Sequence, residues 1–104
     1  MNIKKKSTSI RFLEKLRGGR LTFGRMIESL RLADEISQID LAKYMKMSRA
    51  QLCDIEKGRR IVSPERAAEF AKVMRYSIEQ FVAVAIEDQL RHLGLKYSVE
   101  LSLA

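Results

Sequence analysis

Apolar side chains recur every three or four positions over much of this chain, the spacing of a helix that buries one face. The first run contains Phe23, Met26, Ile27 and Leu30. Thr22 stands directly before it, and threonine is a favoured N-cap because its hydroxyl accepts a free backbone N–H of the first turn. The pattern therefore predicts a first helix that begins after Thr22.

Two short helices are predicted next. Ser37 precedes a segment of about two helical turns, residues 38–45, and Ser48 precedes residues 49–57. Gly58 marks the end of the second segment, since glycine readily adopts the left-handed conformation that closes a helix. Two short helices joined by a tight turn are the outline of a helix-turn-helix.

Serine caps also predict a fourth and a fifth helix. Pro64 follows Ser63 and suits the first helical position, which indicates a helix that runs through Met74. Ser77 opens the next helix and Gly94 stops it. The apolar positions of that fifth helix are Ile78, Phe81, Val82, Ala85, Ile86 and Leu93.

Beyond Gly94 the period changes, because apolar and polar residues alternate strictly, as in a half-buried strand. The apolar members, which would share one face, are Leu95, Tyr97, Val99, Leu101 and Leu103. A lone strand leaves its edge unpaired, so we expect it to pair with a symmetry mate in a two-fold dimer. The same residues would also serve to cover the core of the monomer, and the sequence leaves that alternative open.

Residues 1–20 differ from everything that follows. They carry seven Lys/Arg and one Glu, a net charge of +6, together with Ser, Thr and Gly. This composition indicates a disordered basic arm, followed by one folded domain over residues 21–104. Four apolar residues of the arm fall near helical spacing, in a piece too short to be stable alone: Ile10, Phe12, Leu13 and Leu16.

Composition narrows the function classes. A chain of 104 residues, 46% hydrophobic and 32% charged, fits one globular domain, and it contains neither a secretory signal nor a membrane-length apolar run. We therefore expect a cytoplasmic protein. One cysteine, Cys53, and one histidine, His92, provide no disulfide and no four-ligand metal site. We expect no cofactor and no enzyme activity, since no nucleophile, base and orienting group stand in a recognisable arrangement.

The chain has a net charge of +7, and its charged residues are unevenly distributed along the sequence. Residues 43–60 hold six basic and two acidic side chains, whereas residues 77–104 hold two basic and four acidic ones. An anionic partner, such as nucleic acid, would suit that basic segment.

The helix-turn-helix region also matches a family pattern. The matching residues are Arg31, Ser37, Gln38, Leu41, Ala42, Ser48, Arg49, Leu52, Ile55, Glu56, Gly58 and Pro64. Taken together they resemble the phage-repressor and Cro-like (XRE) helix-turn-helix family, over about residues 21–76. The resemblance implies an all-α fold of five helices, here with a basic N-terminal arm and a short C-terminal β-strand.

The resemblance also implies roles for individual residues. The family inserts the second helix of this pair into the major groove, so the candidate base readers are Arg49, Ala50, Gln51 and Asp54. Ser48, the cap of that helix, is a further candidate DNA-binding residue. Arginine and glutamine can bond guanine and adenine through two hydrogen bonds, and aspartate can accept from cytosine. Candidate phosphate contacts are Gln38, Lys43, Lys46, Lys57, Arg59 and Arg60.

Three further positions bear on local structure. Arg31 and Glu56 match a buried family ion pair that links the first helix to the end of the third, although by sequence alone they could be two separate surface charges. Lys46 stands where the turn commonly has glycine, and Glu35 replaces a frequent glycine after the first helix. Left-handed backbone at a non-glycine residue costs modest strain.

The resemblance implies a dimeric transcriptional repressor of a palindromic DNA operator. Small family members with a short extra segment resemble HigA-type antitoxins, which bind a toxin and repress their own operon. Residues 1–20 would then bind the toxin through Ile10, Phe12, Leu13 and Leu16. A stand-alone phage or restriction-control regulator, whose arm would touch DNA, is the alternative. A protein-interaction module without DNA binding is a further alternative of a different class.

Overall fold

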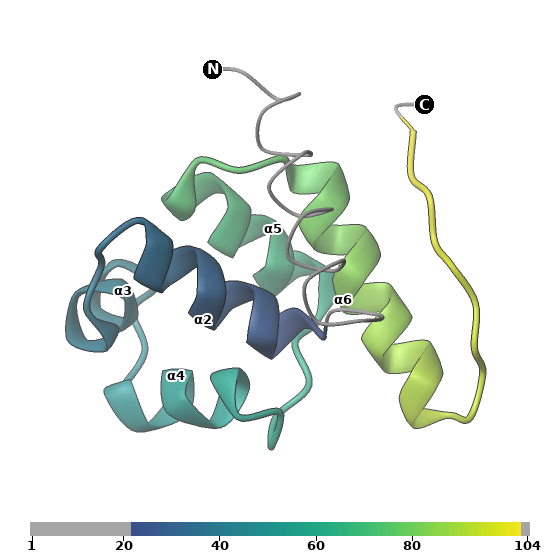
Figure 1. The fold of residues 1–104 in the computed structure, drawn as a ribbon, viewed down its shortest axis with the longest axis horizontal. Helices are drawn as coiled ribbons and strands as arrows, with labels where there is room; N and C mark the ends of the chain where they lie inside the picture. The colour runs from purple at the N-terminus through teal and green to yellow at the C-terminus, as the bar shows by residue number, and fades with distance from the viewer. Residues whose placement is uncertain (1–21, 103–104) are drawn as a thin grey trace.

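The computed structural model describes residues 22–102 and consists there of five helices (Figure 1). These are α2 (Phe23–Ala33), α3 (Gln38–Tyr44), α4 (Arg49–Glu56), α5 (Pro64–Met74) and α6 (Ile78–His92). The all-α, five-helix prediction is confirmed, and each helix begins at the expected residue.

Each helix starts where a hydroxyl can satisfy a first-turn amide. The five N-cap residues accept a backbone N–H from three residues further along, and they are Thr22, Ser37, Ser48, Ser63 and Ser77. Such caps contribute about 1 kcal/mol each, which explains why short local patterns place these helix starts so well.

The helix ends depend on left-handed backbone. Gly58 and Gly94 both have φ of +78°, as expected for glycines after α4 and α6. Glu35 and Lys46 also have positive φ, 58° and 55°. These two residues, which replace glycines common in the family, therefore adopt the left-handed backbone at some cost in strain. Arg75, which ends α5 at φ 64°, is a third case that the sequence did not indicate.

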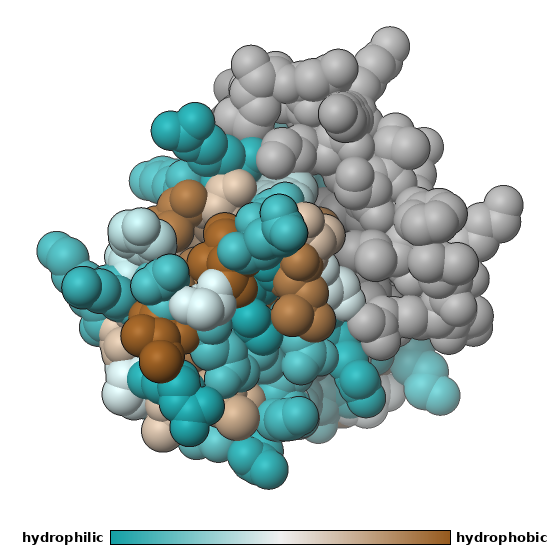
Figure 2. All heavy atoms as spheres, turned by 60° about the vertical axis from the view of Figure 1, so that its left-hand side comes forward, coloured by the Kyte–Doolittle hydropathy of each residue, from teal (hydrophilic) through white to brown (hydrophobic). Residues whose placement is uncertain are grey.

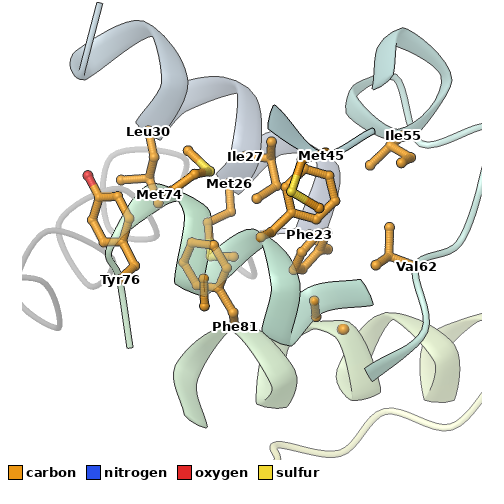
Figure 3. Packing of buried hydrophobic residues seen from close by; sticks show 14 of the residues in the cluster. Phe23, Met26, Ile27, Leu30, Met45, Ile55, Val62, Met74, Tyr76 and Phe81 are labelled. Atoms are coloured by element: carbon orange, nitrogen blue, oxygen red, sulfur yellow. The ribbon is translucent and has the colours of Figure 1, made fainter. Parts of the chain in front are cut away.

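The core lies between α2, α4, α5 and α6 (Figure 3). Helix α2 packs against α4 and α6, and α6 packs against α5. Phe23 makes edge-to-face contacts with Phe70 and Phe81, at ring-centroid distances of 5.7 and 5.9 Å. Tyr76 stacks on Phe81 at 5.6 Å. Aromatic pairs in these geometries add stability beyond the area that they bury.

Tyr76 also carries a polar link across the fold. Its hydroxyl donates to Asp34 Oδ2 at 3.0 Å, which joins the loop after α2 to the α5–α6 corner. Burial, together with the hydrogen bond and the nearby Asp34 charge, raises the pKa of Tyr76. The phenol therefore remains neutral and continues to donate at any physiological pH.

Helices α2 and α4 approach closely at Gly24. A Cβ atom at this position would lie 2.1 Å from the backbone oxygen of Ile55 and 2.9 Å from that of Glu56. No side chain fits there without displacing α4. Gly24 thus fixes how deeply α4 sits against α2, a role that no sequence pattern indicated.

The C-terminal prediction needs correction. Residues 95–102 form no strand, and no strand occurs anywhere in residues 22–102. The tail instead turns back as an extended segment (Figure 1), where Val99 N–H donates to Glu87 Oε2 at 2.7 Å. A strand requires a neighbouring backbone for its hydrogen bonds, and no segment of residues 22–102 forms a strand with the tail.

The apolar positions of the tail are mostly exposed. Leu95, Tyr97 and Leu101 are 42%, 62% and 40% exposed, and Val99 is half-buried. Leu93, expected on the packing face of α6, is 74% exposed because the helix has already ended at His92. Leu103 and the arm residues Ile10, Phe12, Leu13 and Leu16 lie outside the described residues.

Candidate nucleic-acid interface

Helices α3 and α4 form a compact pair across a tight turn. Met47 N–H donates to Ala42 O at 2.9 Å, and the left-handed Lys46 reverses the chain between the two helices. Ala42 is almost fully buried, as are Leu41 and Leu52. A small residue on the inner face of α3 lets α4 pack closely, which sets the angle at which α4 is presented to a ligand.

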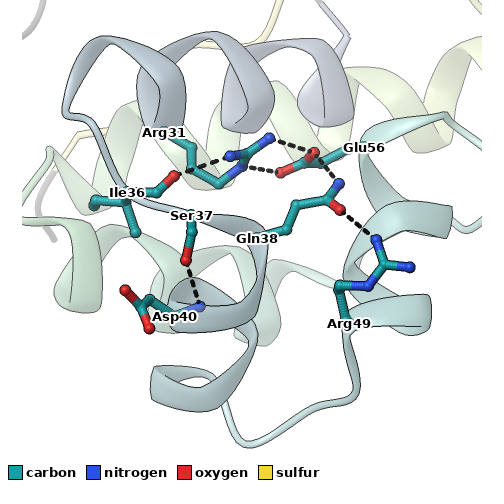
Figure 4. Close-up of polar contacts among 7 residues, drawn as sticks. All are labelled: Arg31, Ile36, Ser37, Gln38, Asp40, Arg49 and Glu56. Carbon is teal, nitrogen blue, oxygen red and sulfur yellow. Dashed lines mark hydrogen bonds and ion pairs between the residues drawn. The ribbon is translucent and has the colours of Figure 1, made fainter.

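A buried ion pair lies behind this unit (Figure 4). Arg31 Nε donates to Glu56 Oε2 at 2.7 Å and Nη2 donates to Oε1 at 3.2 Å. The two side chains are 8% and 0% exposed. Arg31 Nη1 also donates to Ile36 O at 2.9 Å, so one guanidinium joins α2, the loop before α3, and the end of α4.

Gln38 connects the ion pair to the surface. Its Nε2 donates to Glu56 Oε1 at 2.8 Å, and its Oε1 accepts from Arg49 Nη1 at 3.1 Å (Figure 4). A chain of hydrogen bonds thus runs from Arg31 to Arg49, the first residue of α4. Arg49 has further N–H donors, and Gln38 has a second one, with which each could bond DNA.

The other candidate readers on α4 are partly engaged within the protein. Gln51 forms a capping box with Ser48, in which Gln51 Oε1 accepts from Ser48 N–H at 3.0 Å. Asp54 pairs with Arg59 at 3.2 Å, in an exposed contact of the kind that contributes little stability. Ala50 is exposed. Among the candidate readers, Arg49 is the one whose side chain is held by a residue of α3, whereas Gln51 and Asp54 are bonded to Ser48 and Arg59.

Exposed cations precede and follow α4 along the chain. Lys43, Lys46, Lys57 and Arg60 are all exposed. The side of the molecule that carries α3 is largely hydrophilic, with apolar side chains scattered among the polar ones (Figure 2). This surface suits a polyanion better than an apolar partner.

Arg66 is a further basic residue near α4 that sequence reasoning did not single out. Its Nη1 donates to Met45 O at 3.5 Å, and it lines a cavity of about 200 Å³ beside α4 together with Gln51 and Arg60. Its place in the first turn of α5, directly after Pro64, was the available signal, because helix starts combined with a cation attract phosphates.

Two other kinds of site have no candidate in residues 22–102. Cys53 is a half-buried free thiol, and the described part of the chain contains no group of three side chains able to hold a metal ion. No helix between residues 22 and 102 is long and apolar enough to cross a membrane.

Comparison with known proteins agrees with this geometry. A family model described as helix-turn-helix (HTH_3) matches residues 27–81, which is 55 of the 104 residues and spans the segment from α2 to the start of α6. No curated protein and no solved structure matches the chain. With more than half of its length matched, the chain belongs to the HTH_3 (XRE-type) helix-turn-helix family of DNA-binding transcriptional regulators.

Proposed function

We propose that this regulator is a repressor that binds a palindromic operator as a homodimer and that Arg49 is its principal base reader. The observation that supports this most directly is the hydrogen-bond chain from the buried Glu56 through Gln38 to Arg49. An arginine held in place before binding loses less conformational entropy when it bonds a guanine. Lys57 and its basic neighbours then supply affinity for phosphates.

Substitution of Arg49 should change the sequence specificity of DNA binding, whereas substitution of Lys57 should change only the affinity. Arg49→Ala is expected to weaken the preferred operator by about 1–3 kcal/mol and to relax specificity, since base discrimination is lost. Lys57→Ala should weaken all sequences alike and reduce the salt slope of log K by roughly one. Titrations of operator and random duplexes at several salt concentrations measure both effects. Equal losses on the two duplexes for Arg49→Ala would remove Arg49 as a reader.

The dimer is proposed to form through the end of α6 and the tail. The exposed Leu95, Tyr97 and Leu101 favour this, because a second copy would bury their apolar side chains. A two-fold dimer would place its recognition helices about 34 Å apart, one turn of DNA.

Loss of the tail should therefore yield monomers. Truncation after Gly94 is expected to halve the mass in sedimentation, and Leu101→Lys should weaken the dimer without shortening the chain. Operator binding should fall in parallel, whereas binding to a single half-site should not. A truncated protein that remains dimeric would place the interface elsewhere.

More specifically, we propose that the repressor is an antitoxin that binds and neutralises a protein toxin. Its support is sequence-based, since residues 1–20 combine a basic charge with Ile10, Phe12, Leu13 and Leu16. A DNA-contacting arm needs cations but has little use for Phe12 and Leu13, so we propose that this segment folds as an amphipathic helix on an acidic toxin surface.

Deletion of residues 1–20 separates the antitoxin from the stand-alone regulator. The shortened protein is expected to lose toxin neutralisation and to keep operator affinity within about tenfold, since α3 and α4 remain. Co-expression with the product of the adjacent gene, together with operator titration, measures both. A far larger loss of operator affinity would instead assign the segment to DNA.

A further inference from the structure

A second cavity, of about 370 Å³, lies at the end of α4 that is opposite to Arg49. It opens where the start of α2, the end of α4 and the end of α6 meet, with Gly24 and Gly58 in its wall. Its volume falls within the range of small-molecule sites. Two of its basic lining residues, Lys57 and Arg60, are already candidate phosphate contacts, whereas Arg25 has no role assigned above.

Several basic residues line this cavity. Arg25, Lys57 and Arg60 line it, all three are exposed, and no carboxylate within residues 22–102 pairs with any of them. They come from α2 and from the loop after α4, so chain folding rather than sequence adjacency brings Arg25 to the other two.

The carboxylates in the wall are already neutralised. Glu56 is held by Arg31 and Gln38, and Asp88 is held by Arg91. Asp88 Oδ2 also accepts the Phe23 N–H at 2.8 Å, so an anionic oxygen already sits at the positive end of α2. The three unpaired cations are thus the excess charge of the cavity.

We propose that this cavity binds a phosphate group. Three exposed cations that line one concave site provide charge-assisted donors for a tetrahedral anion. The phosphate could belong to the DNA backbone outside the half-site, or to a small phosphorylated molecule that acts on the regulator. The DNA form of this proposal rests on operator binding, and the free-phosphate form does not.

Phosphate titration of the full chain tests the cavity directly. Inorganic phosphate, compared with chloride at equal ionic strength, should shift the amide resonances of Gly24 and Gly58 but not that of Gly94, which does not line the cavity. Arg25→Gln should weaken this binding about two- to fivefold, as for other exposed charge pairs. Lys72→Gln, an equal loss of charge on α5 away from the cavity, should leave it unchanged.

A second experiment identifies the source of the phosphate. On duplexes that extend beyond the half-sites, Arg25→Gln should reduce the salt slope by about one if the cavity binds the backbone, while Lys72→Gln should not. A slope unchanged by Arg25→Gln, with phosphate-dependent shifts at Gly24 and Gly58, identifies a free phosphorylated ligand. Absence of both the shifts and the slope change overturns the proposal. Failure to bind any duplex would contradict the proposed function while the phosphate titration still reports on the cavity.

Discussion

Arg31→Ala is expected to lower the free energy of unfolding by about 3–5 kcal/mol. The substitution leaves the Glu56 carboxylate, which is 0% exposed, without its cation and with one remaining hydrogen bond from Gln38. It also removes the donor to Ile36 O. A buried charge that has lost its partner costs much more than the intact pair contributes, because the desolvation of the carboxylate is no longer offset.

Chemical denaturation followed by circular dichroism measures this loss. Arg59→Ala is the matched control, because Arg59 is the cation of the exposed pair with Asp54, and its removal should cost at most about 1 kcal/mol. The double substitution Arg31→Met, Glu56→Leu should recover most of the stability, since no unpaired charge remains. Similar losses for Arg31→Ala and Arg59→Ala would contradict this prediction. They would show that the Glu56 carboxylate pays no large desolvation penalty when its cation is removed.

Gly24→Ala is expected to have the second largest effect, a loss of about 1–3 kcal/mol or more. Alanine is the better helix former by about 0.5–1 kcal/mol, so propensity alone predicts a gain. The contact decides the sign, because a Cβ atom 2.1 Å from Ile55 O meets backbone that cannot rotate away. Helix α4 would have to move, and Arg49 with it, so operator affinity should fall together with stability.

Gly58 provides the control for Gly24. A Cβ at Gly58 meets nothing within 4 Å, but its φ of +78° disfavours side chains. Gly58→Ala should therefore cost about 1 kcal/mol, and Gly58→Asn less, since asparagine tolerates left-handed backbone. Asparagine at position 24 should be worse than alanine. If Gly24→Ala stabilises the protein in thermal unfolding, the close approach of α2 and α4 is not as rigid as the packing implies.

The sequence by itself determined the five helices and the outline of the interface. Serine and threonine caps, proline and the helical spacing of apolar residues are local signals, and the energies that they represent act within one or two turns. The left-handed conformation of Lys46 was also predictable, because the turn between α3 and α4 needs it whatever residue is present. Tertiary packing does not change the helix starts and turns that these local interactions set.

Only the tertiary structure decided which polar groups meet. Gln38, the candidate phosphate contact, also bridges Glu56 and Arg49 in the folded chain, which its sequence position did not indicate. Arg25 joined two loop cations at a cavity, and Gly24 set the distance between α2 and α4. The prediction of a C-terminal strand was wrong for the same physical reason. Hydrogen bonds, ion pairs and backbone clashes depend on partners that are distant in sequence. Periodicity describes only which face of a segment is apolar.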